Sequence, residues 1–121
     1  MNRPAYLLSY DVGTTGVKTC LFLAEETLML VASSLCGYPL HISEGGGAEQ
    51  DPLDWLSAME KSTKEVLSES GVDPASIAGI SFCSQMQGLV LVDEQGTALR
   101  PAFSYLDQRA TKELKQGLAH G

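Results

Sequence analysis

The sequence predicts an α/β fold in which a three-stranded meander is joined through a helix to a parallel strand. Three observations predict it. Short apolar segments rich in strand formers follow one another in the first third of the chain, separated by glycine-containing or polar turns. A capped amphipathic pattern of helical length comes next. Another apolar run, at residues 77–83, follows it, and a strand reached through a helix usually runs parallel to its predecessor.

Length and composition fit one globular domain. A chain of 121 residues can bury one modest core, and its 44% hydrophobic and 19% charged residues argue against disorder. The net charge of −7 disfavours nucleic acid as a partner, because phosphate neutralisation dominates nonspecific nucleic-acid binding. No apolar run reaches the length of a membrane span, and no signal-peptide core is present. We therefore expect a cytoplasmic protein with no membrane partner.

The meander is expected from strands at residues 4–10, 17–23 and 27–35. The turn between the first two strands contains Gly13 and Gly16, and polar residues 24–26 make the second turn. Three consecutive glycines in the next segment, residues 41–49, predict a loop with few packing side chains and much backbone freedom.

A helix is expected over residues 52–69. Asp51 is a favourable N-cap, Pro52 suits the first helical position, and Gly71 suits the position after the helix. One face carries the apolar positions, and we expect Trp55 and Met59 on it to pack on the sheet. The face comprises Trp55, Leu56, Met59, Thr63, Val66 and Leu67.

The second half begins with the run at residues 77–83, which we expect to be a buried strand. Residues 88–92 and 99–103 are expected to pair as a hairpin around a turn at 93–96, followed by a helix over residues 106–118. The β-β-β-α-β order is that of the first part of a ribonuclease-H-like sheet, with a hairpin and helix added and the next helix and strand missing.

Three cysteines, Cys20, Cys36 and Cys83, are far apart in apolar settings. Their spacing matches neither a metal site nor a disulfide framework, so we expect buried reduced thiols.

The turn from Asp11 to Lys18 has the parts of a phosphate site without the spacing of a Walker A loop. Its glycines let the backbone approach a ligand, Thr14 and Thr15 supply hydroxyls and amides, and Lys18 supplies a cation. Asp11, at the end of the first strand, can hold Mg²⁺. A plain hairpin turn, with glycines at positive φ, is the alternative and on the motif alone the better one.

Two further segments could contact a small polar ligand. Gln85, Met86 and Gln87 follow the strand at residues 77–83, where open α/β sheets bind ligands. Tyr105, Asp107 and Arg109 combine an aromatic, a carboxylate and a guanidinium, a set that suits a sugar. The alternatives are a polar loop and a solvated helix start.

The order of four segments resembles the FGGY family of carbohydrate kinases, closest to its xylulokinase-like branch. These segments are Asp11 to Lys18, Glu49 to Trp55, Gly79 to Gly88 and Arg100 to Arg109. The resemblance implies an actin-like ATPase fold and transfer of the γ-phosphate of ATP to a hydroxyl of a sugar or polyol. The chain would be the N-terminal part of the first kinase domain, a single incomplete domain over residues 1–121. A homodimer of the longer protein is also compatible with it.

The resemblance also implies roles for individual residues. Those assigned to Mg²⁺–ATP are Asp11, which is also the metal ligand, Gly13, Thr14, Thr15 and Lys18. Those assigned to the substrate are Gln85, Met86, Gln87, Tyr105, Asp107 and Arg109. Xylulokinases typically have His at the position of Gln87 and Trp at that of Tyr105, and both differences affect the substrate pocket.

Family kinases are several times longer, and their catalytic base lies beyond the part that this chain resembles. No catalytic residue is therefore assigned here, and the chain alone is expected to be inactive, because phosphoryl transfer needs complete positioning. The alternatives are a free-standing, non-catalytic binding or regulatory module, and a kinase of the glycerol or another polyol branch.

Overall fold

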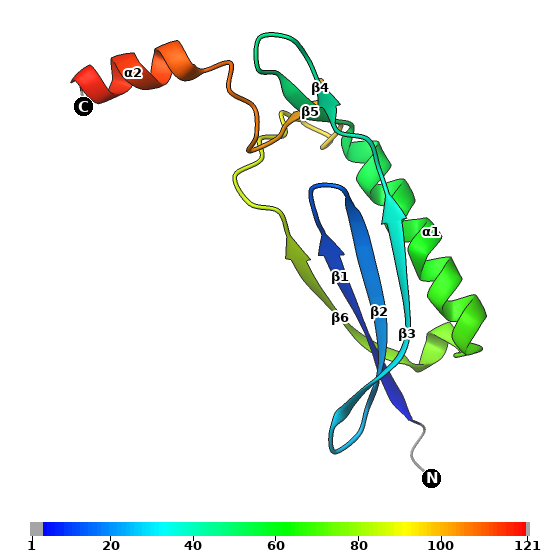
Figure 1. The fold of residues 1–121 in the computed structure, drawn as a ribbon. Coiled ribbons are helices and arrows are strands. Elements are labelled where there is room, and N and C mark those ends of the chain that lie inside the picture. Colours follow the sequence, from blue (N-terminus) through cyan, green and yellow to red (C-terminus); the bar gives the residue numbers. More distant parts are fainter. Residues whose placement is uncertain (1–3, 121) are drawn as a thin grey trace. The chain divides into compact units, whose positions relative to one another are not determined.

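The structure, a computed structural model, describes residues 4–120 and divides the chain into two compact units (Figure 1). Unit 1 comprises Met1–Tyr38 and Leu53–Gln85, and unit 2 comprises Pro39–Pro52 and Met86–Gly121. Neither helix of the described residues is long and apolar enough to cross a membrane.

Unit 1 is a four-stranded sheet with one long helix and a 3₁₀ turn. Its elements are β1 (Ala5–Val12), β2 (Gly16–Ala24), β3 (Leu28–Gly37), α1 (Pro52–Ser70), the turn Pro74–Ser76 and β6 (Ile77–Ser84). The strand order is β3-β2-β1-β6. The first three strands pair antiparallel, while β6 runs parallel to β1. The predicted meander and the parallel crossover are therefore confirmed.

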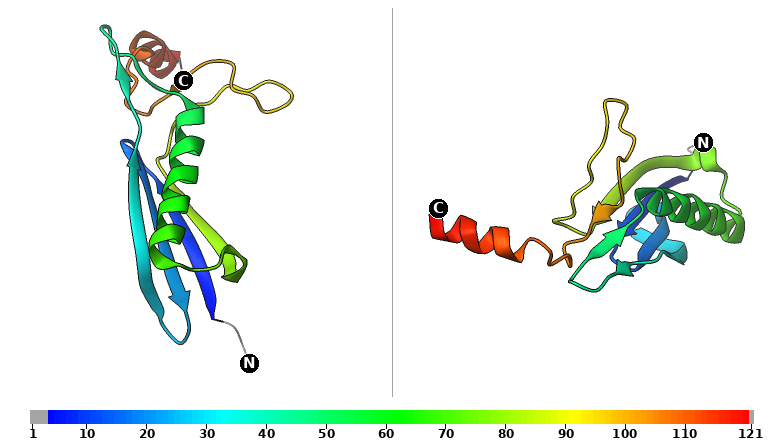
Figure 2. Two further views of the ribbon diagram at one scale, coloured as in Figure 1. Left: turned by 90° about the vertical axis from the view of Figure 1, so that its right-hand side faces the viewer. Right: turned by 90° about the horizontal axis from the view of Figure 1, so that it is seen from above.

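Helix α1 lies along one face of this sheet (Figure 2). The core between them is made of Leu8, Tyr10, Val17, Leu21, Tyr38, Ala58 and Val66. Trp55 and Met59 pack against it, as predicted. The prediction that Leu56 lies on the packed face is wrong: Leu56 is 61% exposed, because the buried stripe of α1 runs through Ala58, Ser62 and Val66. Gly71 ends the helix at φ +69°, and its amide donates to the Leu67 carbonyl.

The expectation that residues 77–83 form a buried strand is half right. The strand is present, but Ile80 and Phe82 are more than half exposed. The reason is its place in the sheet: β6 is an edge strand whose neighbour is β1. Cys83 on this strand is likewise exposed, so its predicted burial is wrong, while Cys20 and Cys36 are partly buried, and all three thiols are free.

Unit 2 contains the small sheet β4-β5-β7 and a C-terminal helix. Its elements are β4 (His41–Ile42), β5 (Ala48–Gln50), β7 (Ala102–Phe103) and α2 (Thr111–His120). The segment expected as a plain loop, residues 41–49, therefore forms a short hairpin. The glycines at its tip, Gly45 and Gly46, take φ near +90°.

The hairpin expected at residues 88–103 is present in an irregular form. Isolated bridges join Leu89 to Phe103 and Val92 to Ala98. The predicted turn at 93–96 is confirmed, with Gly96 at φ +81°. The last helix begins at Thr111, not at residue 106, because hydrogen-bonded turns occupy the residues before it.

Candidate functional site

The turn between β1 and β2 is a tight hairpin of three connecting residues. Val12 pairs with Val17, and the Gly13 amide donates to the Gly16 carbonyl at 2.9 Å. Tyr38, just after β3, holds this turn from the side. Its amide donates to the Thr15 carbonyl at 3.1 Å, and its hydroxyl donates to the Gly13 carbonyl. The turn is thereby fixed to the third strand as well as to the two that it joins.

The glycines of this turn are required by close packing and not by backbone conformation. Neither Gly13 nor Gly16 has a positive φ. A Cβ on Gly16 would lie 2.7 Å from the Cys36 carbonyl oxygen of β3, which is closer than real Cβ contacts. The alternative explanation of these glycines as positive-φ turn residues is therefore wrong.

Asp11 and Lys18 are cross-strand partners at the base of the hairpin. The neighbouring Tyr10 hydroxyl bonds Thr63 of α1, so the alternation of the strand directs Asp11 to the opposite face of the sheet. The two charged residues border a hollow of about 150 Å³ on that face. Its lining also includes Ser9, Tyr10, Cys20, Ser81, Phe82 and Cys83.

The negative charge of Asp11 affects the pKa of Tyr38, which holds the turn. Burial, and secondly the negative charge of Asp11, raise the pKa of Tyr38 above its usual value. The Tyr38 hydroxyl therefore stays protonated and can donate to Gly13. Within residues 4–120, no three potential metal-ligating side chains of His, Cys, Asp or Glu gather together. Asp11 is therefore not part of a cluster of three or more such side chains among the described residues.

The residues after β6 belong to both units. The Gln85 amide donates to the Val12 carbonyl at 2.8 Å, so Gln85 is anchored beside the turn in unit 1. Met86 and Gln87 belong to unit 2. Met86 is 78% exposed. Gln87 has φ +65°, a left-handed backbone conformation that residues other than glycine rarely adopt.

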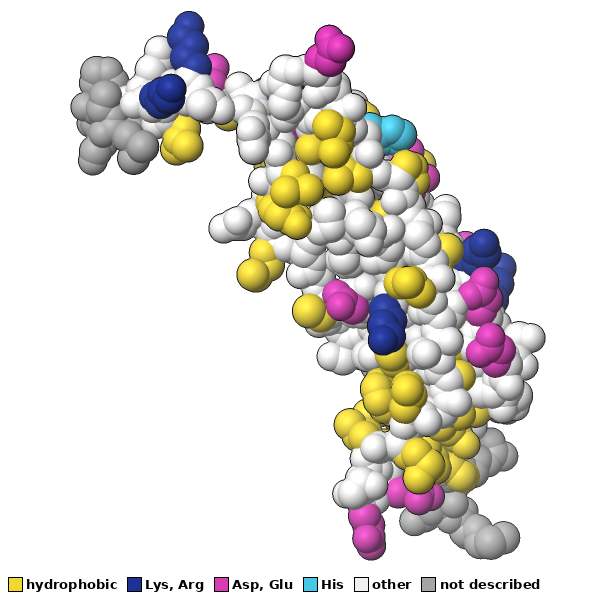
Figure 3. Space-filling view, in the orientation of Figure 1, with side chains coloured by type: hydrophobic (Ala, Val, Ile, Leu, Met, Phe, Trp, Pro, Cys, Tyr) yellow, Lys and Arg dark blue, Asp and Glu magenta, His cyan; other side chains and the backbone are white. Residues whose placement is uncertain are grey.

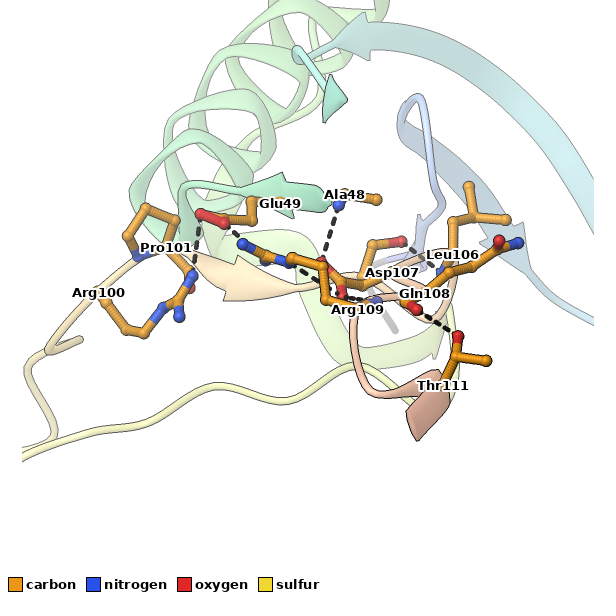
Figure 4. Close-up of polar contacts among 10 residues, drawn as sticks. Ala48, Glu49, Arg100, Pro101, Leu106, Asp107, Gln108, Arg109 and Thr111 are labelled. Carbon is orange, nitrogen blue, oxygen red and sulfur yellow. Dashed lines mark hydrogen bonds and ion pairs between the residues drawn. The ribbon is translucent and has the colours of Figure 1, made fainter. Parts of the chain in front are cut away.

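Asp107 and Arg109 belong to a charged network in unit 2 that also includes Glu49 and Arg100 (Figure 4). Glu49 bridges the two arginines, with oxygen–nitrogen distances of 3.0 Å to Arg100 and 2.7 Å to Arg109. Asp107 accepts from Arg109 at 2.6 Å and from the Ala48 amide at 2.8 Å. The structure therefore brings Asp107 and Arg109 together through internal contacts.

The network shifts the titration of its members. Hydrogen bonding from Arg109, and then from the Ala48 amide, holds the pKa of Asp107 far below its usual range. Arg109, and secondly Arg100, lower the pKa of Glu49. Asp107 and then Glu49 raise the pKa of Arg109. Glu49, Asp107 and Arg109 are consequently charged near neutral pH.

Phe103 and a hollow lie beside this network. The Arg100 guanidinium stands 3.7 Å from the centre of the Phe103 ring, and that of Arg109 stands 5.2 Å from it. A hollow of about 420 Å³ borders Phe103, Asp107 and Arg109. Leu89, Ser104, Ala110 and Glu113 complete its lining.

The predicted site residues thus form two groups, one in each unit. Unit 1 brings together Asp11, Lys18, the turn and Gln85, whereas Tyr105 shares unit 2 with Asp107 and Arg109. Sequence reasoning missed Tyr38, Glu49 and Arg100. Glu49 and Arg100 are the first residues of two of the four segments that resemble the family, but no local sequence pattern showed that the two side chains meet.

Comparisons with known proteins point to one family. The model of the FGGY family of carbohydrate kinases, N-terminal domain, matches residues 6–118. The xylulose kinase of Bacillus subtilis (strain 168) is 36% identical over 108 residues, which are 89% of this chain and 21% of that protein. The chain spans about a fifth of the length of the curated relatives that it matches.

Solved structures agree with this. A "xyloylose kinase" from Brucella ovis superposes with a TM-score of 0.86 at 28% identity, over 95% of this chain and 24% of that one. A gluconate kinase from Lactobacillus acidophilus has the same TM-score and identity, over 98% of this chain and 23% of that one. The predicted ribonuclease-H-like, actin-like ATPase fold is confirmed.

Proposed function

The chain belongs to the FGGY family of carbohydrate kinases, and from this premise we propose that it is the N-terminal part of the first domain of an ATP-dependent sugar or polyol kinase. The family match over residues 6–118 is the observation that carries the proposal. The whole protein would transfer the γ-phosphate of ATP to a substrate hydroxyl in the cytoplasm, and a homodimer is compatible with this proposal. A pentulose such as xylulose is the first candidate substrate, because a xylulose kinase is among its most similar relatives.

In this proposal the β1–β2 turn binds the phosphates of Mg²⁺–ATP. Lys18 and the backbone and hydroxyl groups of Gly13, Thr14 and Thr15 would contact phosphate oxygens. Asp11 would hold Mg²⁺, which neutralises charge on the transferring phosphoryl group when it is bound. Two features support this assignment: the exposed acid and base at the hairpin, and the Tyr38 bonds that hold the turn.

The substrate would be contacted by the residues that follow β6 and by those that precede α2. Gln85, Met86 and Gln87 form the first group, and Tyr105, Asp107 and Arg109 form the second. Exposed Met86 and Tyr105 offer apolar surface for the carbon face of a sugar. The 420 Å³ hollow beside Phe103 supports a ligand of that size near the second group.

The test is a coupled ADP-release assay with pentuloses, gluconate, glycerol and other polyols. The whole protein that carries this chain is expected to turn over one of them, and the 121-residue chain alone none, because a general base and the rest of the cleft are also needed. Asp11→Asn is expected to lower kcat of the whole protein by about a hundredfold or more. The matched control is Glu26→Gln, which removes a charge from the exposed β2–β3 turn and should leave kcat unchanged.

Two results would contradict the proposal. Sugar-dependent turnover by the 121-residue chain, lost in Asp11→Asn, would place a complete active site within these residues. A whole protein that binds sugar or nucleotide without any turnover would favour a non-catalytic binding module.

A further inference from the structure

We propose that Glu49 and Arg100, together with Asp107 and Arg109, are positioning residues that hold residues 104–109, the 104–109 loop, against residues 45–49, the glycine loop. These four residues, called the clamp below, would fix the position of Tyr105 at the substrate site. The inference therefore rests on the proposed function. It assigns Glu49 and Arg100, which had no role, and gives Asp107 and Arg109 a positioning role in addition to their proposed contact with the substrate.

The first support is that both carboxylates are occupied by donors of this chain. The two oxygens of Glu49 bind Arg100 and Arg109. One oxygen of Asp107 accepts from the Ala48 amide and the Arg109 guanidinium, and the other accepts from the Arg109 amide and Nε at 3.1 and 3.2 Å. Two positive and two negative charges thus neutralise one another, with the Asp107 side chain only 9% exposed. Charged groups paired in this way hold the two segments that carry them together.

The second support is that the backbone joins the same two loops. The Ser104 amide donates to the Ala48 carbonyl at 2.9 Å, and the Gln108 amide donates to the Gly46 carbonyl at 2.8 Å. With the Ala48 amide on Asp107, hydrogen bonds hold the 104–109 loop near both of its ends. Figure 4 shows the side-chain part of this clamp between β5 and the loop.

The third support is the need for glycine where the loops meet. A Cβ on Gly46 would come within 3.2 Å of Gln108 Cβ, and one on Gly47 within 3.3 Å of the Arg109 guanidinium and 2.1 Å of the Ser43 hydroxyl. Gly46 and Gly47 therefore permit close approach of the charged loop, in addition to the backbone freedom that Gly45 and Gly46 use at positive φ.

Tyr105 is the side chain that this clamp presents. It stands between Ser104, which is 8% exposed, and Leu106, which is 42% exposed, while its own exposed fraction is 46%. The hydrogen bonds of Ser104 and Asp107 to Ala48 hold the backbone on either side of Tyr105 while its side chain stays exposed. Loosening the anchors is therefore expected to misplace Tyr105 while leaving the phosphate turn of unit 1 intact.

The clamp is tested first by amide hydrogen exchange on the 121-residue chain. Glu49→Gln removes the central charge, and Arg100→Lys keeps the charge but loses the planar guanidinium. Either variant is expected to speed exchange at the Ser104 and Gln108 amides about tenfold while exchange in β1 and β2 stays unchanged. The matched control is Glu60→Gln, which breaks the exposed Glu60–Lys64 pair on α1 and should leave these amides unchanged. Unchanged exchange in both Glu49→Gln and Arg100→Lys would overturn the clamp.

Steady-state kinetics of the whole protein test what the clamp is for. Glu49→Gln is expected to raise the sugar KM about tenfold with the ATP KM unchanged, because only sugar contacts are misplaced. In a Tyr105→Ala background, Glu49→Gln should then have little further effect, since the group that it positions is gone. A full additional loss in that background would mean direct contact with substrate and would overturn the inference.

The two proposals fail in different ways. A wild-type protein without sugar-dependent turnover would contradict the proposed function, while the exchange result would still decide whether the clamp exists. An active protein whose 104–109 loop exchanges equally in all variants would contradict the clamp alone.

Discussion

Of the two glycines in the β1–β2 turn, Gly16 has less room for a side chain than Gly13. Its missing side chain lets β2 start directly against the β3 backbone, where a Cβ would lie 2.7 Å from the Cys36 carbonyl oxygen. Tyr38 also holds this turn: its amide donates to the Thr15 carbonyl, and its hydroxyl donates to the Gly13 carbonyl. Turn geometry therefore depends on β3 as much as on the turn residues.

Gly16→Ala is expected to lower the free energy of unfolding by about 1–3 kcal/mol, because the β3 backbone must move to admit the methyl group. Urea unfolding monitored by Trp55 fluorescence measures this. The matched control is Gly117→Ala on α2, where a Cβ meets nothing within 4 Å. That change should stabilise slightly or do nothing, since alanine favours helix. Equal effects of the two variants would contradict the close-packing explanation.

At the scale of elements, α1 is joined to the sheet by hydroxyl groups as well as by apolar packing. The Thr19 and Ser62 hydroxyls are 2.6 Å apart, and both residues are fully buried. Beside them, the Tyr10 hydroxyl lies 2.6 Å from that of Thr63. These bonds set the position of α1 along β1 and β2.

Ser62→Ala is expected to cost about 1–3 kcal/mol of stability, because it leaves the Thr19 hydroxyl buried without its partner. Adding Thr19→Val should return part of that loss, since the pair is then apolar on both sides. Urea unfolding of the two single variants and the double variant measures the coupling. Strictly additive losses would contradict the role of this hydrogen bond.

At the scale of the whole molecule, the sheet of unit 1 has one covered and one uncovered face. Hydrophobic side chains gather over the sheet face that Figure 1 presents, as Figure 3 shows. Leu30 and Leu35 are 55% and 73% exposed on β3. Apolar surface of this kind promotes association between chains.

We therefore expect the 121-residue chain to self-associate in solution. Leu30→Lys should weaken this association about tenfold, because each copy loses the burial of one leucine and gains a charge. Sedimentation velocity over a concentration series measures the change. Leu56→Lys, at a leucine that is 61% exposed on α1, is the control and should have little effect. Equal weakening by both variants would show that the uncovered sheet face is not the contact.

Local sequence patterns were enough to predict the elements of unit 1 and the candidate turn. Strand formers, glycine turns and helix caps act over a few residues, so β1 to β3, α1 and the end of α1 at Gly71 follow from local pattern. The same is true of the turn at residues 93–96. Four ordered segments then indicated the family, which the comparison over residues 6–118 confirmed. The individual site residues stay predictions.

Which distant residues meet, and which surfaces are covered, depends on the folded arrangement of the chain. Glu49 and Arg109 are 60 positions apart, and no local pattern pairs them. The exposure of β6 depends on its place at the edge of the sheet, and the demand for Gly16 and Gly47 depends on neighbours from other segments. The physical reason is range: propensity and periodicity act within a turn or a helix, whereas burial, close approach and ion pairing exist only once the chain has brought remote segments together.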